Sequence, residues 1–490
     1  MFVFSAKLPK NTGMFKLFLR IHSSFMLVFF ALGVLLGTVF CFLFNLRPLS
    51  SPIWIITSAV LLIFPIIFPI RVFVPLALLS GFMLSSFRVY SELRSLEDIS
   101  KFYSHEVVVF GEIPEDPDFD GASYSINLKA TSINNLKDLN ASFFVKLRTT
   151  EKLSRYDRLT LRGKLGDKFG SFSATMFLPK LLEISSPDPP DPILSLRDNF
   201  SENLKKHITA PESSLSLGYL LGQKTALDKE LSEALRTVGL THIVVASGAN
   251  LLILVGLSRR IFSKISRFAS LFFGVVLILL FTVMVGFSPS ILRAGVVSIL
   301  SLLAWFVGRK FHPIKLLLLV AALTLLINPG YILSLAWLLS FASFSGIMIL
   351  SPILTSYLYG DRQPNFIVQV FLETFCAQLF CLPFILFFFG SVSLVGIIAN
   401  AIILPTIPLV MLLSFLAGLT YFLPVFPALV GFFATQILHL HILIANYFSQ
   451  LTWAIIGIPS ENPLVFCIFI PLVVLCIASG YRLNRQNVLE

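Results

Sequence analysis

A histidine, a serine and an asparagine interrupt the apolar stretch THIVVASGANLLILVG, residues 241–256, where their side chains could do chemistry. His242 and Ser247 would form a general base and a nucleophile if they met. On a helix, however, positions 242 and 250 project about 80° apart, and Ser247 points to a substantially different side. The Gly-x-Ser-x-Gly pattern of a nucleophile elbow is also missing. We therefore expect no catalytic residue here: Ser247, Gly248 and Asn250 favour a pore-lining or closely packed helix.

A second polar group follows in FSPSILRAG, residues 287–295, at the start of another apolar segment. Ser290 precedes Arg293 by about one turn, close to where we expect the helix to begin. A helix N-terminus with hydroxyl groups and a guanidinium is suited to bind an anion or a phosphate. The alternative is an arginine whose head group snorkels to the lipid headgroups.

Acidic residues are scarce between His242 and Gly480, where the sequence contains Asp361, Glu373 and Glu461 alone. Proton and cation relays through membranes normally depend on several carboxylates, so this scarcity counts against a cation-coupled carrier. Glu373 lies inside its apolar segment, and it either faces the interior of the helix bundle or snorkels toward an interface.

Metal and redox chemistry find little support in the sequence. His439 and His441 in LHLHILI diverge by about 200° on a helix, and no nearby carboxylate or cysteine supports a metal pair. The cysteines all fall within apolar segments, where they act as small hydrophobic residues. No Walker-type nucleotide loop occurs. We expect no metal, no cofactor and no enzymatic activity.

Membrane helices must position these residues. The chain has 490 residues, of which 56% are hydrophobic and 13% charged, a composition far outside that of soluble proteins. The net charge of +11 settles little, because polytopic proteins carry basic residues for topology. We expect a polytopic α-helical membrane protein with about twelve transmembrane helices. The expected spans are residues 24–45, 53–69, 72–91, 242–257, 268–287, 290–308, 314–328, 331–350, 366–389, 391–423 (broken by Pro405 and Pro408), 425–450 and 464–480.

A polar region separates the first three spans from the rest. Period-two alternation in EVVVFGEI, YSINLKATSI, ASFFVKLRTT and DRLTLRGKL predicts about five short strands. Basic loops fall on one side of the membrane, which places both termini in the cytoplasm and this β domain outside. The chain then divides into three transmembrane helices at 1–91, an inserted extracellular β domain at 92–191, amphipathic interfacial helices within 192–241 and a second transmembrane block at 242–490.

Aromatic residues lie near the later, basic half of the β domain. Tyr124, Phe143 and Phe144 are near Lys146 and Arg148, a combination compatible with base stacking and phosphate contact on single-stranded nucleic acid. The alternative is that the aromatic rings pack the core and the charges solvate the surface.

The order of these features resembles one family. A polar β domain lies between two helical blocks. The chain after this domain contains four segments that carry the resemblance: LLGQKTALDKELSEALRTVGLTHIVVASGANLLIL (220–254), GFSPSILRAGVVSILSLLAWFVGR (286–309), AWLLSFASFSGIMIL (336–350) and AQLFCLPFILFFFGSVSLVGIIANAIILP (377–405). The chain is similar to the ComEC/Rec2-type competence proteins, the inner-membrane channels for DNA uptake in natural transformation.

The resemblance implies that the β domain is an OB fold and that the block at 242–490 is a competence-type channel domain for single-stranded DNA. It implies a multi-pass protein of the bacterial inner membrane whose β domain is extracellular or periplasmic. The implied partners are single-stranded DNA, membrane lipid, a separate cytoplasmic ATPase motor and a membrane DNA receptor, with a separate nuclease as a further possibility.

Two departures from the family pattern matter. Asn250 stands where the family commonly has a histidine. The metallo-β-lactamase-like domain of many members, with its His-x-His-x-Asp-His motif, is not found in this sequence. Nuclease activity is therefore not expected of this polypeptide.

The candidate pore-lining residues combine polarity with a position in the second block: His242, Ser247, Gly248, Asn250, Ser290, Arg293, Ser340, Glu373, Gln378 and Asn400. Scarce acids and repeated weak contacts suit a channel for a polyanion. A transporter or flippase for a smaller anionic solute or lipid would need the same groups, so it remains the alternative. A membrane enzyme is a second alternative, although paired carboxylates and a metal cluster are missing.

Overall fold

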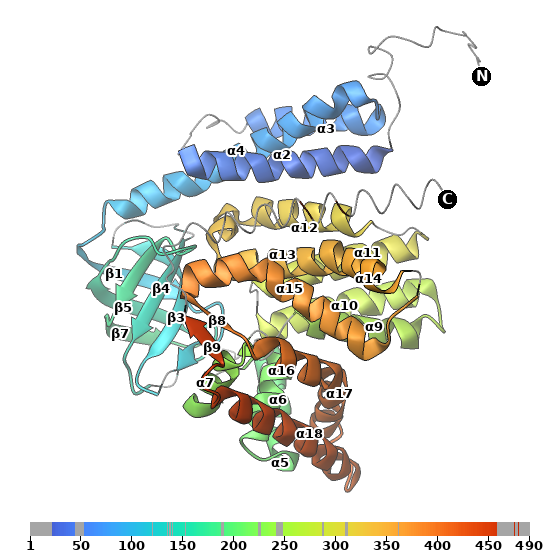
Figure 1. Ribbon diagram of the computed structural model, residues 1–490. Coiled ribbons are helices and arrows are strands. Elements are labelled where there is room, and N and C mark those ends of the chain that lie inside the picture. Colours follow the sequence, from blue (N-terminus) through green and yellow to red (C-terminus); the bar gives the residue numbers. More distant parts are fainter. Residues whose placement is uncertain are drawn as a thin grey trace. The chain divides into compact units, whose positions relative to one another are not determined.

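The structure is a computed structural model, and it divides the chain into two compact units. One unit comprises residues 1–98 with 315–332, and the other comprises 99–314 with 333–490 (Figure 1). The residues that the structure describes are 22–44, 53–119, 121–134, 136, 139, 141–151, 153–187, 191–223, 227–241, 248–286, 289–308, 312–360, 362–457, 475 and 479.

The first unit is helical. Its elements are α2 (Ser23–Phe44), α3 (Ile53–Ile67), α4 (Val74–Ser100) and most of α12 (Pro313–Ile327). Ser58 and Ser80 join α3 to α4, since each hydroxyl donates to the other residue's carbonyl oxygen, at 2.8 and 2.7 Å. Small polar side chains are effective at such contacts because lipid offers them no competing partner.

Arg88 on α4 closes the end of α12. Its Nε donates to the carbonyl oxygen of Leu326 at 2.8 Å, and its Nη2 donates to that of Ile327 at 2.7 Å. The last carbonyls of a helix have no partner within the helix and carry partial negative charge, so a guanidinium stabilises them.

The second unit contains a seven-stranded sheet. Its strands are β1 (Glu106–Glu112), β2 (Asp118–Phe119), β3 (Tyr124–Ile133), β4 (Ala141–Leu147), β5 (Arg158–Lys164), β6 (Ala174–Phe177) and β7 (Lys180–Ser185). The order is β6-β4-β3-β1-β5-β7, with β2 beside β3; β4 and β6 are parallel and the other pairs antiparallel. Alternate residues of β1, β3, β4 and β5 point into one apolar core, which makes a barrel-like domain.

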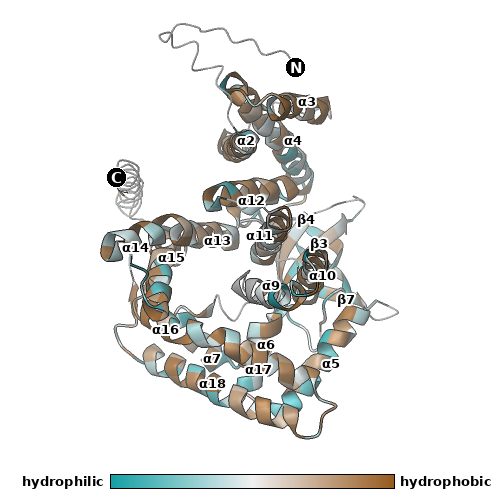
Figure 2. Ribbon diagram, turned by 90° about the vertical axis from the view of Figure 1, so that its right-hand side faces the viewer, coloured by the Kyte–Doolittle hydropathy of each residue, from teal (hydrophilic) through white to brown (hydrophobic). Residues whose placement is uncertain are grey.

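The rest of the second unit is mostly helical. Its helices are α5 (Pro192–His207), α6 (Glu212–Leu221), α7 (Lys229–Thr237), α9 (Gly248–Phe262), α10 (Arg267–Val285), α11 (Pro289–Phe306), α13 (Leu335–Ser345), α14 (Ser351–Tyr359), α15 (Phe366–Phe389), α16 (Gly396–Ile403), α17 (Ile407–Leu419) and α18 (Phe426–Ser449). Two short strands, β8 (Ser391–Ser393) and β9 (Ile455–Gly457), pair antiparallel. Figure 2 shows hydrophobic residues along most of the helices, with hydrophilic positions on α5.

Seven helices among the described residues are long and apolar enough to cross a membrane, and three shorter apolar helices accompany them. The chain is therefore a membrane protein with a small β domain, as predicted. The count of twelve crossings stays a prediction, because the expected span at 464–480 lies almost wholly outside the described residues.

Some expected boundaries are wrong. The third helix does not end at residue 91, because α4 continues to Ser100 through SELRSLEDIS, which is rich in helix formers. The span expected at 331–350 starts later, at Leu335, and passes through a π turn (Gly346–Leu350) into α14. The span expected at 391–423 is interrupted by a 3-10 turn at Leu404–Thr406 that contains Pro405, one of the two prolines expected to break it.

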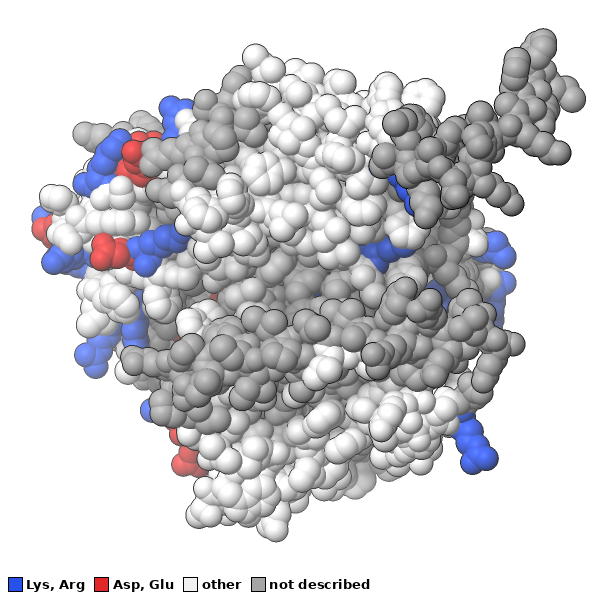
Figure 3. Space-filling view, turned by 45° about the horizontal axis from the view of Figure 1, so that its top comes forward, with Lys and Arg blue, Asp and Glu red and all other residues white. Residues whose placement is uncertain are grey.

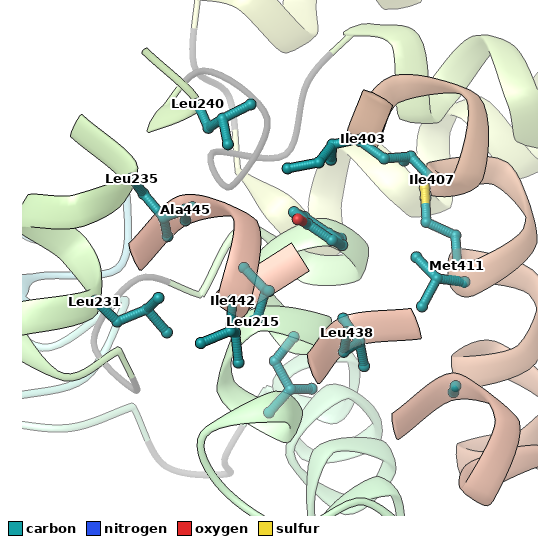
Figure 4. Close-up of a cluster of buried hydrophobic side chains, with 14 of the residues drawn as sticks. Leu215, Leu231, Leu235, Leu240, Ile403, Ile407, Met411, Leu438, Ile442 and Ala445 are labelled. Carbon is teal, nitrogen blue, oxygen red and sulfur yellow. The ribbon is translucent and has the colours of Figure 1, made fainter. Parts of the chain in front are cut away.

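Helix α6 was not expected from the sequence. All ten of its residues are buried, and it contributes to an apolar core with α7, α16, α17 and α18 (Figure 4). Its sequence, ESSLSLGYLL, is too short to predict a membrane span. Its polar and apolar residues do not separate onto two helix faces, so the sequence does not predict an amphipathic helix either. Contacts made by other helices decide its burial.

Close helix packing in the first unit gives a test. A side chain added at Gly81 would meet the backbone of Phe30 and Val34, which cannot move aside as a flexible side chain can. We expect Gly81→Ala to lower the free energy of unfolding by about 1–3 kcal/mol through overpacking. Gly256→Ala is the matched control, because no atom lies within 4 Å of an added Cβ there, and it should stabilise its helix slightly. Thermal unfolding of the detergent-purified chain measures both, and a Gly81→Ala protein as stable as the parent would contradict the packing.

Candidate functional site

Arg293 is the most unusual side chain of the second helical block. It projects from α11, and its guanidinium carbon lies 5.8 Å from the ring centroid of Phe341 and 5.5 Å from that of Phe344. The two phenylalanines are three residues apart on α13, which places them on one face of that helix. The guanidinium Nε is buried and has no hydrogen-bond partner.

Ser290 and Ser340 lie on the same two helices as this arginine and its rings. Ser290 is half-buried on the first turn of α11, and Ser340 is half-buried next to Phe341 on α13. Ser290 therefore lies near Arg293 along the chain and Ser340 lies beside Phe341, whereas Phe341 and Phe344 were missed. The Phe-x-x-Phe spacing in SFASF was the available signal, since it places both rings on one helix face.

The carboxylate of Glu373 is occupied within its own helix. Gln369 Nε2 donates to Glu373 Oε1 at 2.6 Å across one turn of α15, and Glu373 is half-buried. Five residues after Glu373, Gln378 Nε2 donates to the carbonyl oxygen of Ser393 at 3.2 Å, which ties α15 to β8. Glu373 and Gln378 therefore belong to one helix, but their side chains have different hydrogen-bond partners.

Asn400 is buried at the start of the broken helical segment. Its Nδ2 donates to the carbonyl oxygen of Gly396 at 2.8 Å, while its buried Oδ1 has no partner. The Ser393 hydroxyl accepts from the Gly396 amide at 3.1 Å, which satisfies the first amide of α16. Gly239, after α7, lies against Ser393 and Gly396. Asn400 thus belongs to a packed seam between α7 and α16.

Gly248 and Asn250 lie at the start of α9. Gly248 is its first residue and Asn250 its third. His242 and Ser247 lie outside the described residues, as do the side-chain surroundings of Asn250.

Other polar side chains of α18 pair with α6. His439 Nδ1 lies 2.9 Å from Glu212 Oε1, so a carboxylate does stand beside it, contrary to the sequence expectation. His441 is buried between the Tyr219 hydroxyl and the Thr406 hydroxyl, at 3.3 and 2.7 Å. The two histidines have different partners, as their divergence on the helix predicts, and the described residues contain no group of three or more side chains that could hold a metal.

The β domain separates its aromatic residues by strand face. Phe143 is fully buried in the core, so it cannot stack on a nucleotide, and its inclusion among the DNA-binding candidates is corrected. Phe144 points to the opposite face, because successive strand residues alternate. Its ring lies 5.7–6.3 Å from three rings that the sequence analysis missed: Phe169, Phe172 and Phe177.

We call these four phenylalanines the aromatic patch. Phe169 and Phe177 are 64% and 65% exposed, which is unusual for rings of this size on a folded domain. Lys146 is half-buried beside the patch on β4 and Arg148 is exposed just beyond that strand. Figure 3 shows charged side chains gathered over the β domain, at the left of the view. The sequence signal for these missed rings was FGSF at 169–172, in which two phenylalanines lie three residues apart close to a run of basic residues.

Tyr103 holds one edge of the aromatic patch. Its hydroxyl donates to the carbonyl oxygen of Ser173, next to Phe172, at 2.6 Å. Burial, with a smaller effect of the Asp167 carboxylate, raises the pKa of Tyr103, so the hydroxyl keeps its proton and remains a donor at neutral pH. Tyr124 lies apart from the patch and packs on Phe119, with ring centroids 4.6 Å apart.

Comparison with known proteins locates the family signal in the helical block. The family described as Competence protein matches residues 219–483, more than half of the chain. The chain belongs to this family. A curated relative, ComE operon protein 3 of Bacillus subtilis (strain 168), is 25% identical over 213 residues, covering 41% of this chain and 27% of the relative. Recombination protein 2 of Haemophilus influenzae is 24% identical over 251 residues, covering 46% of this chain and 31% of that protein. The alignments thus span less than a third of each relative, and no solved structure matches.

The competence-family match contains Arg293, its two phenylalanines and the seam at Asn400, and it leaves out the β domain. Two arginines nevertheless attach that domain to the helices of the second unit. Arg155, 2% exposed, donates to the carbonyl oxygen of Met284 near the end of α10 at 3.2 Å. Arg197 on α5 donates from Nη1 to both carboxylate oxygens of Asp116, at 2.9 and 2.7 Å. Arg155 therefore joins the β domain to the region that the family match covers, and Arg197 joins it to α5, which precedes that region.

The strand faces of the β domain give a stability test. Phe143→Ala should lower the free energy of unfolding by about 3–5 kcal/mol, because it empties space in a closed core. Phe169→Ala removes the same ring from an exposed position, and it should change stability by about 0.5 kcal/mol or less. Chemical denaturation followed by far-UV circular dichroism compares the two. Equal losses would show that the two faces are assigned wrongly.

Proposed function

We propose that this chain is an inner-membrane channel that passes single-stranded DNA into the cytoplasm during DNA uptake. The observation that carries the proposal is the competence-family match over 219–483, which covers the helical block from α6 to beyond α18. One of the relatives, Recombination protein 2, is named for recombination, a process that acts on DNA.

The interruptions of the helical block support a transport role. The π turn between α13 and α14 and the 3-10 turn before α17 free backbone groups from regular hydrogen bonding. In lipid such groups are tolerated where protein or a water-filled path receives them. A path lined by hydroxyls, amides and one arginine, with few acids, suits a polyanion.

The β domain is proposed to receive the strand before it enters the helical block. Its strand order, with β1 between β3 and β5 and β6 parallel to β4, is compatible with a partly open OB-type barrel. The aromatic patch beside Lys146 and Arg148 combines a stacking surface with phosphate-binding charge. The positive-inside pattern supports an extracellular or periplasmic position for this domain and cytoplasmic termini.

The proposed partners are those that the family resemblance implies. The given sequence contains no nucleotide-binding loop, and a separate cytoplasmic ATPase is proposed to pull the strand. A membrane DNA receptor would deliver DNA to the β domain, and a separate nuclease would remove the second strand. Membrane lipid surrounds the helices.

Deletion of the gene in its own bacterium tests the function. We expect transformation by added chromosomal DNA to fall to the spontaneous-mutation background, and a plasmid copy of the gene to restore it. DNA bound at the cell surface should persist in the deletion strain, because the proposed step follows surface binding. Normal transformation together with loss of transport of a small anionic solute would support the carrier alternative and sink the channel.

The aromatic patch gives a second test. Phe169→Ala with Phe177→Ala should weaken binding of a labelled single-stranded oligonucleotide to the purified full chain by about 1–3 kcal/mol for each stacked base lost. Leu182→Ala on β7 is the control, since that side chain is also exposed but lies at the other end of the sheet order. Fluorescence anisotropy measures the affinities. An unchanged affinity in the double variant would remove the patch from the DNA path.

A further inference from the structure

Arg293 carries a charge that the described structure does not balance. It lies on α11, whose sequence PSILRAGVVSILSLLAWF contains no other ionisable residue. The structure records neither an ion pair nor a hydrogen bond to its guanidinium among the described residues, and its Nε is buried. The side chain as a whole is half-buried. A guanidinium nitrogen buried without a partner is costly, so the presence of Arg293 in an apolar helix indicates a role in binding.

Three well-packed arginines that lie in or against the helices differ from Arg293 in this respect. Arg88 donates to two carbonyl oxygens at the end of α12. Arg155 donates to the Met284 carbonyl, and Arg197 to the Asp116 carboxylate. Each of these has at least one acceptor from the chain itself, whereas Arg293 has aromatic rings alone.

Glu373, the acidic residue of α15, does not supply the missing acceptor. Glu373, on α15, accepts a hydrogen bond from Gln369 at 2.6 Å and forms no ion pair with Arg293 among the described residues. The rings of Phe341 and Phe344 stabilise the cation but cannot accept its N–H groups in the plane of the guanidinium. Those N–H groups remain available to an oxyanion that can accept two parallel hydrogen bonds.

We propose that Arg293, held against Phe341 and Phe344, is a phosphate-binding site within the membrane block. Its ligand is the phosphate group of a phosphate ester, supplied either by a DNA phosphodiester or by a lipid headgroup. The first source rests on the proposed function, and the second does not. The aromatic rings keep the guanidinium in place without neutralising it, so a phosphate can be bound and released.

Purified full chain in a maltoside detergent, which contains no phosphate, allows the test. Binding of a labelled oligothymidylate is measured across a salt series for the parent, Arg293→Gln and Arg293→Lys. Loss of one phosphate contact to a single strand lowers the slope of log affinity against log salt by about 0.7. We expect that loss in Arg293→Gln and a retained slope in Arg293→Lys, which keeps the charge.

Arg259→Gln is the matched control. Arg259 also lies over an aromatic ring, that of Trp305 at 5.5 Å, but it is exposed near the end of α9. Its slope should equal that of the parent. Elution as a single species and an unchanged helical circular dichroism spectrum establish that each variant is folded.

A second arm separates the two sources of phosphate. Addition of phosphatidylglycerol should raise the melting temperature of the parent but not of Arg293→Gln if a lipid headgroup fills the site. A slope change without this lipid effect assigns the site to DNA, and the lipid effect without a slope change assigns it to lipid. The proposal is overturned if neither measurement depends on residue 293, or if Arg259→Gln changes the slope equally. Failure of the gene-deletion test would leave the lipid arm standing, so the two proposals fail independently.

Discussion

Hydrocarbon offers no hydrogen-bond partner to a peptide group, and the helical architecture of this chain follows from that constraint. Regular helices satisfy their own backbone, so they account for most of the described residues outside the β domain. The backbone groups at the ends of helices need hydrogen-bond partners from outside the helix. Arg88 gives it to α12 and Arg155 to α10, in both cases by donating to carbonyl oxygens near a helix C-terminus.

The same constraint makes the irregular segments informative. The π turn after α13, the 3-10 turn before α17 and the short pair β8 and β9 all lie in the second unit. Hydrogen bonds of Ser393, Gln378 and Asn400 lie at β8 and the start of α16 that follows it. Polar side chains thus gather where the regular helix is broken, because there they can satisfy exposed backbone groups.

Sequence patterns predicted which helices and strands form more accurately than they predicted the contacts between those elements. Hydropathy located the apolar helices and period-two alternation located the main strands, since both signals arise from a repeat along the chain. Boundaries were less accurate: α4 runs on to Ser100, and α6 was not expected at all. A short helix buried on every side shows no periodicity, because its surroundings come from elements far away in the sequence.

The site shows the same division. Arg293 and Phe144 were identified from the sequence, but Phe143 was grouped with Phe144 although strand alternation turns their rings to opposite faces. Phe169 and Phe177 join Phe144 only through the parallel pairing of β4 with β6 and the loop before it. Phe341 and Phe344 meet Arg293 only where α13 packs on α11.

By itself, the sequence determined that this is a membrane protein with an inserted β domain and that it resembles the competence family, because composition, periodicity and motifs are local properties. The tertiary structure alone decided which polar groups have partners. His439 meets Glu212, and Arg197 meets Asp116, across long stretches of chain. Arg293 meets no acceptor among the described residues. Hydrogen bonding acts over a few ångströms in space, and spacing along the chain cannot report that distance.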